Sequence, residues 1–250
     1  LKSLSEFIRT SGSIAKINIS KTEEKSYYPL SFGQKRLYVL QQFESASTIY
    51  NLPGALEIKG ELDVNKLKNV FTTIISRHES LRTSFEMING EPVQKVHKDV
   101  AFDIETIDFL GKSENEINGF VNNLVQSFDL TKAPLFRVKL IRVAENAHII
   151  FYDMNHLIAD GTSMSILVNE FITLNKGSEL SPLPLQFKDY SNWQNEFLSS
   201  KEMLKQKEFW MEYLSNPSTF ELPSDFERGE NKSFNGSRIS VVQNNMVSEI

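Results

Sequence analysis

Apolar residues recur along this chain at two different spacings, which predicts a mixture of helices and strands. Residues 63–77 carry apolar side chains three and four positions apart behind the acidic residue Asp63, which is the pattern of a capped amphipathic helix. The same spacing predicts further helices over residues 34–43, 113–128, 161–174, 189–199 and 202–214.

Shorter apolar runs predict strands over residues 51–58, 83–87, 92–97, 135–143 and 148–154. The last two runs should pair, and the final one is apolar enough to lie inside a sheet. The dipeptide Asn89-Gly90 separates the second run from the third and predicts a hairpin turn. Helices that alternate with strands and hairpins indicate an α/β sandwich with a mixed sheet.

The pattern changes towards both ends of the chain. We place the start of a second lobe near Leu180, and we expect a polar loop over residues 225–237 and a strand over residues 238–242. Residues 1–10 put their apolar side chains on one helical face, and the polar residues 11–28 are expected to form a linker.

Composition narrows the class of protein. A chain of 250 residues that is 40% hydrophobic can bury a substantial core, and a net charge of −5 carries no electrostatic footprint for nucleic acid. No apolar run approaches the ~20 residues of a membrane span, so no membrane contact is expected. The absence of cysteine suits a cytoplasmic location and removes most zinc-site patterns, so no metal site is expected.

The segment around His156 carries the candidate chemistry. His156 follows an apolar strand, with Asp160 and Gly161 four and five positions later and a helical pattern after them. A neutral imidazole can accept a proton near neutral pH, and glycine allows a tight turn and close approach. A plainer interpretation is equally consistent with these residues alone: the histidine ends a strand and Asp160 caps the next helix.

Two other sites can be drawn from the same residues, and neither has support. Ser163, His156 and Asp153 could be written as a triad, but no nucleophile elbow surrounds the serine. His156 and Asp160 as a metal pair would need a helix through Gly161 and further ligands.

Four segments in order resemble one known family. Residues 154–163 are similar to the HHxxxDG core of the condensation domains of nonribosomal peptide synthetases, with Asn155 in place of the first histidine. Residues 30–40 resemble the family's first motif, S-x-A-Q-x-R-L-W/Y-x-L, and residues 77–85 match the second, RHExLRTxF, at every fixed position. Residues 187–194 resemble the fourth, YxDYAxWQ.

The resemblance implies a chloramphenicol-acetyltransferase-like two-layer sandwich with a mixed sheet, in one complete lobe and part of a second. Residues 29–179 would form the N-terminal lobe and residues 180–250 the start of the C-terminal lobe. Residues 1–10 resemble the last helix of a preceding carrier domain, joined by the linker over residues 11–28.

The resemblance also implies a reaction, in which an acceptor amine attacks a donor thioester and a peptide bond forms. His156 would orient the amine or take its proton, and the backbone N–H of Gly161 would lie near the carbonyl. Asp160 is expected to be architectural, in a buried turn where it would need a cationic partner or several N–H donors. Arg82 is the candidate cation in this chain, and an arginine in the missing half of the domain would serve equally well. Asn155 keeps the hydrogen bonding of the first position but cannot titrate.

Partners follow from the same resemblance. The chain is expected to bind no cofactor itself and to meet the 4'-phosphopantetheine arms of upstream and downstream carrier domains, beside an adenylation domain. The residues after the DG pair imply an L-configured donor. Because the later family motifs are absent, the chain alone is expected to fold but to form no peptide bond. The alternative is a non-catalytic module that docks carriers or tailoring enzymes.

Overall fold

The computed structural model describes residues 18–43, 48–218, 220, 223 and 239. The chain divides into two compact units, Leu1–Gln206 and Lys207–Ile250, and each is described here by itself. The helix expected over residues 1–10 and the loop expected over residues 225–237 lie outside the described residues, as does the strand expected over residues 238–242 except for Ile239.

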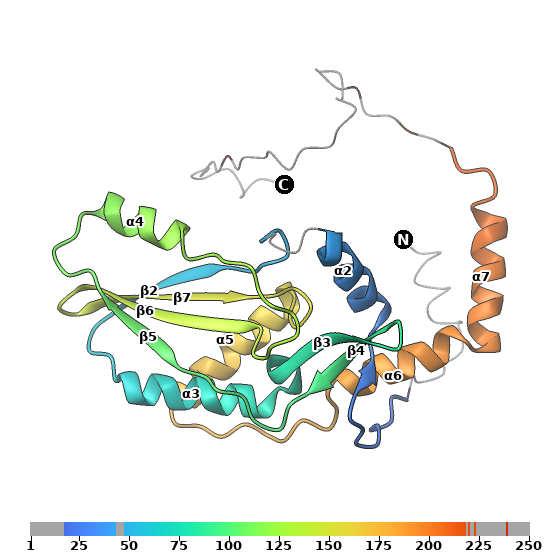
Figure 1. The fold of residues 1–250 in the computed structure, drawn as a ribbon, viewed down its shortest axis with the longest axis horizontal. Coiled ribbons are helices and arrows are strands. Elements are labelled where there is room, and N and C mark those ends of the chain that lie inside the picture. Colours follow the sequence, from blue (N-terminus) through green and yellow to red (C-terminus); the bar gives the residue numbers. More distant parts are fainter. Residues whose placement is uncertain (1–17, 44–47, 219, 221–222, 224–238, 240–250) are drawn as a thin grey trace, which may run out of the picture. The chain divides into compact units, whose positions relative to one another are not determined.

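A four-stranded sheet forms the centre of the first unit (Figure 1). Its strands lie in the order β2, β7, β6, β5, with bounds Gly54–Lys59, Ala147–Met154, Phe136–Ala144 and Ile104–Asp108. Strand β7 is antiparallel to both β2 and β6, whereas β5 runs parallel to β6. The sheet is therefore mixed, and the predicted pairing of β6 with β7 is confirmed, with β7 inside the sheet.

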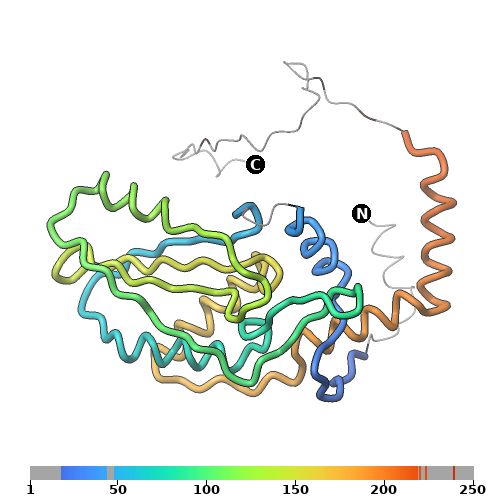
Figure 2. The backbone as a smooth tube through the Cα atoms, in the orientation of Figure 1, coloured from blue at the N-terminus to red at the C-terminus, as the bar shows by residue number. Residues whose placement is uncertain are grey.

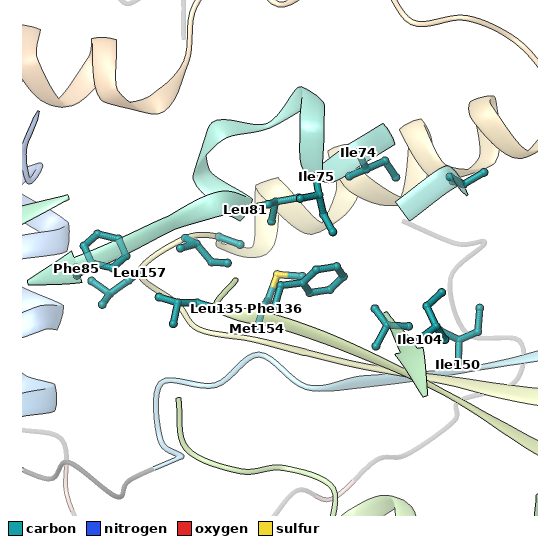
Figure 3. Packing of buried hydrophobic residues seen from close by; sticks show 14 of the residues in the cluster. Ile74, Ile75, Leu81, Phe85, Ile104, Leu135, Phe136, Ile150, Met154 and Leu157 are labelled. Atoms are coloured by element: carbon teal, nitrogen blue, oxygen red, sulfur yellow. The ribbon is translucent and has the colours of Figure 1, made fainter. Parts of the chain in front are cut away.

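Helices α3 (Val64–Arg77) and α5 (Gly161–Asn175) cover one face of this sheet (Figure 1). The predicted N-cap of α3 is present, because the Asp63 side chain accepts from the backbone N–H of Lys66. In Figure 3, Ile74 and Ile75 of α3 lie over the strands that carry Phe136 and Met154. All four side chains are at most 5% exposed and belong to the main hydrophobic core.

Helix α4 (Glu114–Asn122) lies on the opposite face, over a smaller cluster of Leu124, Ile141 and Phe151 (Figure 1). A capping box between Ser113 and Glu116 starts the helix where the sequence predicted. The helix ends at Asn122, so the prediction that it continues to residue 128 is wrong.

A second, three-stranded sheet has the order β1, β4, β3, with bounds Tyr28–Pro29, Glu91–Val96 and Thr83–Ile88. Strands β3 and β4 form the predicted hairpin. Asn89 and Gly90 both have positive φ, 52° and 83°, which a two-residue hairpin turn requires. Just before β3, the short 3-10 helix η1 (Glu79–Arg82) follows α3.

Helices α2 (Phe32–Phe43) and α6 (Phe187–Leu198) complete the first unit. Figure 2 shows the segment before α2 running beside α6, and the backbone N–H of Thr22 donates to Asp189 Oδ1 at 2.8 Å. Part of the expected linker is thus hydrogen-bonded to α6. The compact unit continues past Leu180 to Gln206, and the lobe boundary near Leu180 stays a prediction.

Helix α7 (Lys201–Tyr213) crosses from the first unit into the second. Within the second unit it carries the neighbouring rings of Phe209, Trp210 and Tyr213. In the described part of the chain, no helix combines the length and the apolar character needed to cross a bilayer.

Candidate active site

His156 lies immediately after β7, where the chain leaves the sheet and turns towards α5. Its backbone N–H donates to the Tyr50 carbonyl at 2.8 Å, and Asn155 pairs with Asn51 in an isolated antiparallel bridge. The apolar strand before it anchors the position, because Phe151 and Met154 are at most 2% exposed. His156 itself is half-buried.

A cavity of about 250 Å³ opens beside His156. The starts of α2 and α5 contribute Gly33 and Ser163, while η1 and α6 contribute Ser80 and Phe187. Among the described residues, no side-chain hydrogen-bond partner is found for the imidazole. The ring is therefore free to bond with a molecule that enters the cavity.

Asn155 is 2% exposed, and its side chain is hydrogen-bonded within the fold. Its Nδ2 donates to Gln41 Oε1 at 2.8 Å, and its Oδ1 accepts from the Leu157 backbone N–H at 3.0 Å. One amide thus joins α2 to the turn that presents His156. An amide can donate and accept at once, so asparagine fits this position.

Asp160 is exposed, which corrects the expectation of a buried turn. It is the N-cap of α5, and its Oδ1 accepts from the backbone N–H of Ser163 at 2.8 Å and from its hydroxyl at 2.7 Å. These bonds, the backbone one first, hold the pKa of Asp160 below its usual value, with a smaller effect from nearby His156. The carboxylate is ionised at neutral pH and is stabilised by the helix it caps.

The expected ion pair between Asp160 and Arg82 is wrong. Arg82 lies in η1, where its guanidinium donates to the carbonyl of His97 and pairs with Glu79 at 3.6 Å. Glu79 also pairs with Lys188 of α6 at 2.9 Å. Arg82 is therefore held by Glu79 and by the His97 carbonyl just after β4. Asp160 needs no cation, because the N–H and the hydroxyl of Ser163 at the start of α5 bond with its carboxylate.

Gly161 is the first residue of α5 and is exposed. Its φ is not positive, and a Cβ built on it meets no atom within 4 Å. Neither backbone conformation nor packing within the described residues requires glycine here. The position leaves open space at a helix N-terminus, where the first N–H groups have no partner inside the helix.

Two other histidines, His78 and His97, have structural partners. His78 Nε2 lies 2.6 Å from Glu170 Oε2, and Arg77 Nε lies 3.0 Å from the other oxygen of the same carboxylate. Arg77 and His78, at the end of α3, therefore connect this helix to α5 through Glu170. His97 Nε2 bonds with the Ser84 hydroxyl at 2.7 Å, and burial lowers its pKa.

Neither the triad nor the metal pair that could be drawn from the sequence is formed in the described residues. Ser163 bonds with Asp160, and Asp153 bonds with Asn51 at 2.8 Å, so Ser163, His156 and Asp153 do not form a relay. Within the described residues, no group of three His, Cys, Asp or Glu side chains could hold a metal ion.

Gln34 is a further residue beside His156 that connects separate segments of the site. Its Nε2 donates to the Leu157 carbonyl at 3.1 Å, and its Oε1 accepts from the Ser31 backbone N–H at 3.1 Å and from the Ser191 hydroxyl at 3.5 Å. The signal was available, because Gln34 is a fixed position of the first motif. That motif is joined to the third and fourth through this one buried side chain.

The sequence of this chain matches a known protein family. The Condensation domain family matches residues 24–249, which is most of the chain. The chain belongs to the condensation domain family. It is 44% identical to bacitracin synthase 3 of Bacillus licheniformis over 240 residues, which is 96% of this chain and 4% of that synthase.

Solved condensation domain structures share the fold, which is the expected chloramphenicol-acetyltransferase-like one. The starter condensation domain of rhizomide synthetase RzmA superposes with a TM-score of 0.69 at 18% identity, covering 78% of this chain and 49% of that one. The X-domain from teicoplanin biosynthesis superposes with a TM-score of 0.72 at 25% identity, covering 85% and 49%. The chain thus spans about half the length of these solved structures.

Proposed function

We propose that this chain supplies the His156 side of the catalytic cleft in a condensation domain that forms peptide bonds on a nonribosomal peptide synthetase. The observation that carries the proposal is the half-buried imidazole of His156, beside a cavity of about 250 Å³ and without a side-chain hydrogen-bond partner among the described residues. The backbone N–H of His156 is held by the Tyr50 carbonyl. The substrates would be an acceptor aminoacyl group and a donor aminoacyl or peptidyl group, each held as a thioester on the 4'-phosphopantetheine arm of a carrier domain.

In the proposed reaction, the acceptor amine nitrogen attacks the donor carbonyl carbon, and a C–N bond forms as the C–S bond breaks. The amine loses one proton, and the departing thiolate gains one. A free amine is already nucleophilic, so His156 contributes mainly by hydrogen-bonding and orienting it, with the imidazole available to carry the proton. The backbone N–H of Gly161, at the positive end of α5, would face the developing oxyanion.

His156→Ala tests the proposal in a synthetase module that carries this sequence, assayed in a single turnover with two loaded carriers. Loss of an orienting or acid–base group should slow dipeptide formation by about 10²–10⁴-fold. His148→Ala is the matched control, because His148 lies at the other end of the same strand. A folded His156→Ala variant with near-normal turnover would contradict the proposal.

The same assay resolves donor stereochemistry and partners. We propose an L-configured donor, so the matching D-aminoacyl carrier should give much less product. Upstream and downstream carriers and an adjacent adenylation domain are the proposed partners, and the reducing cytoplasm is the proposed compartment because the chain has no cysteine.

A second candidate function is a non-catalytic docking module. The likeness to the X-domain, which is also known in a complex with OxyB, favours it, together with the asparagine at position 155. The two candidates differ in one measurement. A docking module would bind its protein partner but give no dipeptide with any pair of loaded carriers, and His156→Ala would not change its binding.

A further inference from the structure

A polar cluster of the buried residues Asn51 and Asp153 and the half-buried Arg137 lies beside the end of β7, just before His156. Asp153 is 0% exposed and Asn51 is 8% exposed. Asn51 Nδ2 donates to Asp153 Oδ2 at 2.8 Å, and Arg137 Nε lies 3.5 Å from the same oxygen. Burying a carboxylate is costly even when it is paired. If stability were the only requirement, a hydrophobic residue at this position would be as good.

The cluster also holds the segment that follows α4. Asn51 Nδ2 makes a second bond, to the Gln126 carbonyl at 2.8 Å, and Arg137 Nη2 donates to that same carbonyl at 2.8 Å. Arg137 further donates to the Ser127 carbonyl at 3.2 Å, and its guanidinium lies over the Phe128 ring at 3.7 Å. Arg137 and Asn51 therefore fix residues 126–128 against the sheet.

The segment around Asn51 is in turn the backbone partner of His156. Tyr50 accepts from the His156 N–H at 2.8 Å, and the Leu52 N–H donates to Met154 at 2.7 Å. Asn51, between them, bridges to Asn155. A displacement of Asn51 would be transmitted to the His156 backbone through one hydrogen bond.

We propose that Asn51, Asp153 and Arg137 are positioning residues that fix the imidazole of His156 for condensation. The inference rests on the proposed function of His156 and explains what holds its imidazole in position. Catalysis by orientation is sensitive to small displacements, since misplacing a group by about 1 Å can cost roughly 10²-fold in rate. A cluster that locks residues 50–52 to β7 supplies the rigidity that such orientation needs.

The test uses Asn51→Ser, which removes both donated bonds without adding charge, in two measurements. In the synthetase module, the single-turnover rate should fall by about tenfold to a hundredfold, while the acceptor-carrier concentration at half-saturation stays unchanged. In the 250-residue chain, the NMR resonances of the His156 imidazole, assigned by comparison with His156→Ala, should shift or broaden. Ile141→Val is the matched control, because it perturbs a 0% exposed core position on the same strand as Arg137 and should change neither readout.

Exchanging the amide and the carboxylate tests the contact between Asn51 and Asp153. Asn51→Asp places a second carboxylate against Asp153 and should lower the rate further than Asn51→Ser. Adding Asp153→Asn restores one donor and one acceptor across the 2.8 Å contact and should recover part of that loss. A merely structural cluster would lower the melting temperature in all these variants without moving the imidazole resonances or the rate of the folded protein.

Two results are separable. Unchanged imidazole resonances in folded Asn51→Ser would overturn the positioning role, whatever the effect of His156→Ala on turnover. Normal turnover by His156→Ala would overturn the proposed function, while shifted resonances in Asn51→Ser would still establish that the cluster places the ring.

Discussion

Upstream of His156, the side chains of Asp153 and Asn155 are buried and bonded within the protein, whereas downstream Asp160 and Gly161 are exposed at the first turn of α5. The upstream residues bond to segments about a hundred residues away, namely Asn51 and Gln41. Within the described residues, Asp160 bonds only to the helix that it begins. His156 is thus held by the buried residues before it and is accessible beside the exposed residues after it. A residue that orients a substrate needs both a fixed position and access.

The two aspartates show the same difference in their electrostatics. Burial raises the pKa of Asp153, although Arg137 and the amide of Asn51 oppose the rise. The N–H of Ser163 lowers the pKa of Asp160. The folded protein therefore favours the protonated form of Asp153 and the ionised form of Asp160, seven residues later.

Asp153→Ala should be the most damaging change to the upstream side. It leaves the Arg137 guanidinium without its carboxylate and removes one of the two acceptors of the Asn51 amide. Removing one partner of a buried ion pair costs about 3–5 kcal/mol of unfolding free energy, which urea denaturation would measure. A loss below about 1 kcal/mol would show that the cluster is not a buried ion pair in energetic terms.

Asp160→Ala should cost less, because it removes only a helix cap. Loss of an N-cap typically costs about 1 kcal/mol. Asp160→Asn is the matched control, since asparagine caps as well as aspartate and should melt like the parent. A loss of several kcal/mol in Asp160→Ala would instead point to a buried partner that the described contacts do not contain.

The two aspartates should also respond oppositely to pH. For Asp160, the folded pKa lies below the unfolded value of about 3.9, so its contribution to stability is present above pH 4 and is lost as the pH falls further. For Asp153, the folded state binds the proton more tightly than the unfolded state, so stability rises as the pH falls from neutral towards 4. Urea titrations of Asp160→Asn and Asp153→Asn against the parent at several pH values should show these opposite trends. Parallel curves for the two variants would contradict the assignment.

Gly161→Ala should have the smallest effect on stability and a favourable one. Alanine restricts the unfolded chain and meets open space here, so a gain of about 0.4–1 kcal/mol is expected. If a substrate carbonyl approaches the start of α5, the same methyl group should slow condensation. A more stable variant with an unchanged rate would remove Gly161 from the proposed site.

The elements with strong local signals were predictable from the sequence. Asp63 and the apolar residues behind it predicted α3, and Asn89-Gly90 predicted the β3–β4 hairpin. Strand β5 was missed because its five residues hold only two apolar side chains and it pairs in parallel with a strand far along the chain. The overlong prediction for α4 arose because Leu124 and Phe128 keep the apolar pattern but pack after the helix has ended.

The candidate site was predictable only where it is local. The motif around His156 predicted a strand, a turn and a capped helix, and all three are present. The pairing of Asp160 with Arg82 failed because charge complementarity in a sequence does not tell which groups meet. The contact of Asn51 with Asp153 spans 102 residues and has no local signature, so no spacing rule could have found it.

Gln34 has a consequence for how the protein is made. Its side chain bonds to groups 123 and 157 residues further along the chain. A ribosome adds about 5–20 residues per second, so the amide waits on the order of ten seconds for its last partner to be synthesised. During that interval Tyr38, one turn further along α2, lacks the later segments that bury it. Helix α2 therefore stays incompletely packed, and accessible to chaperones and proteases, until α6 has been synthesised.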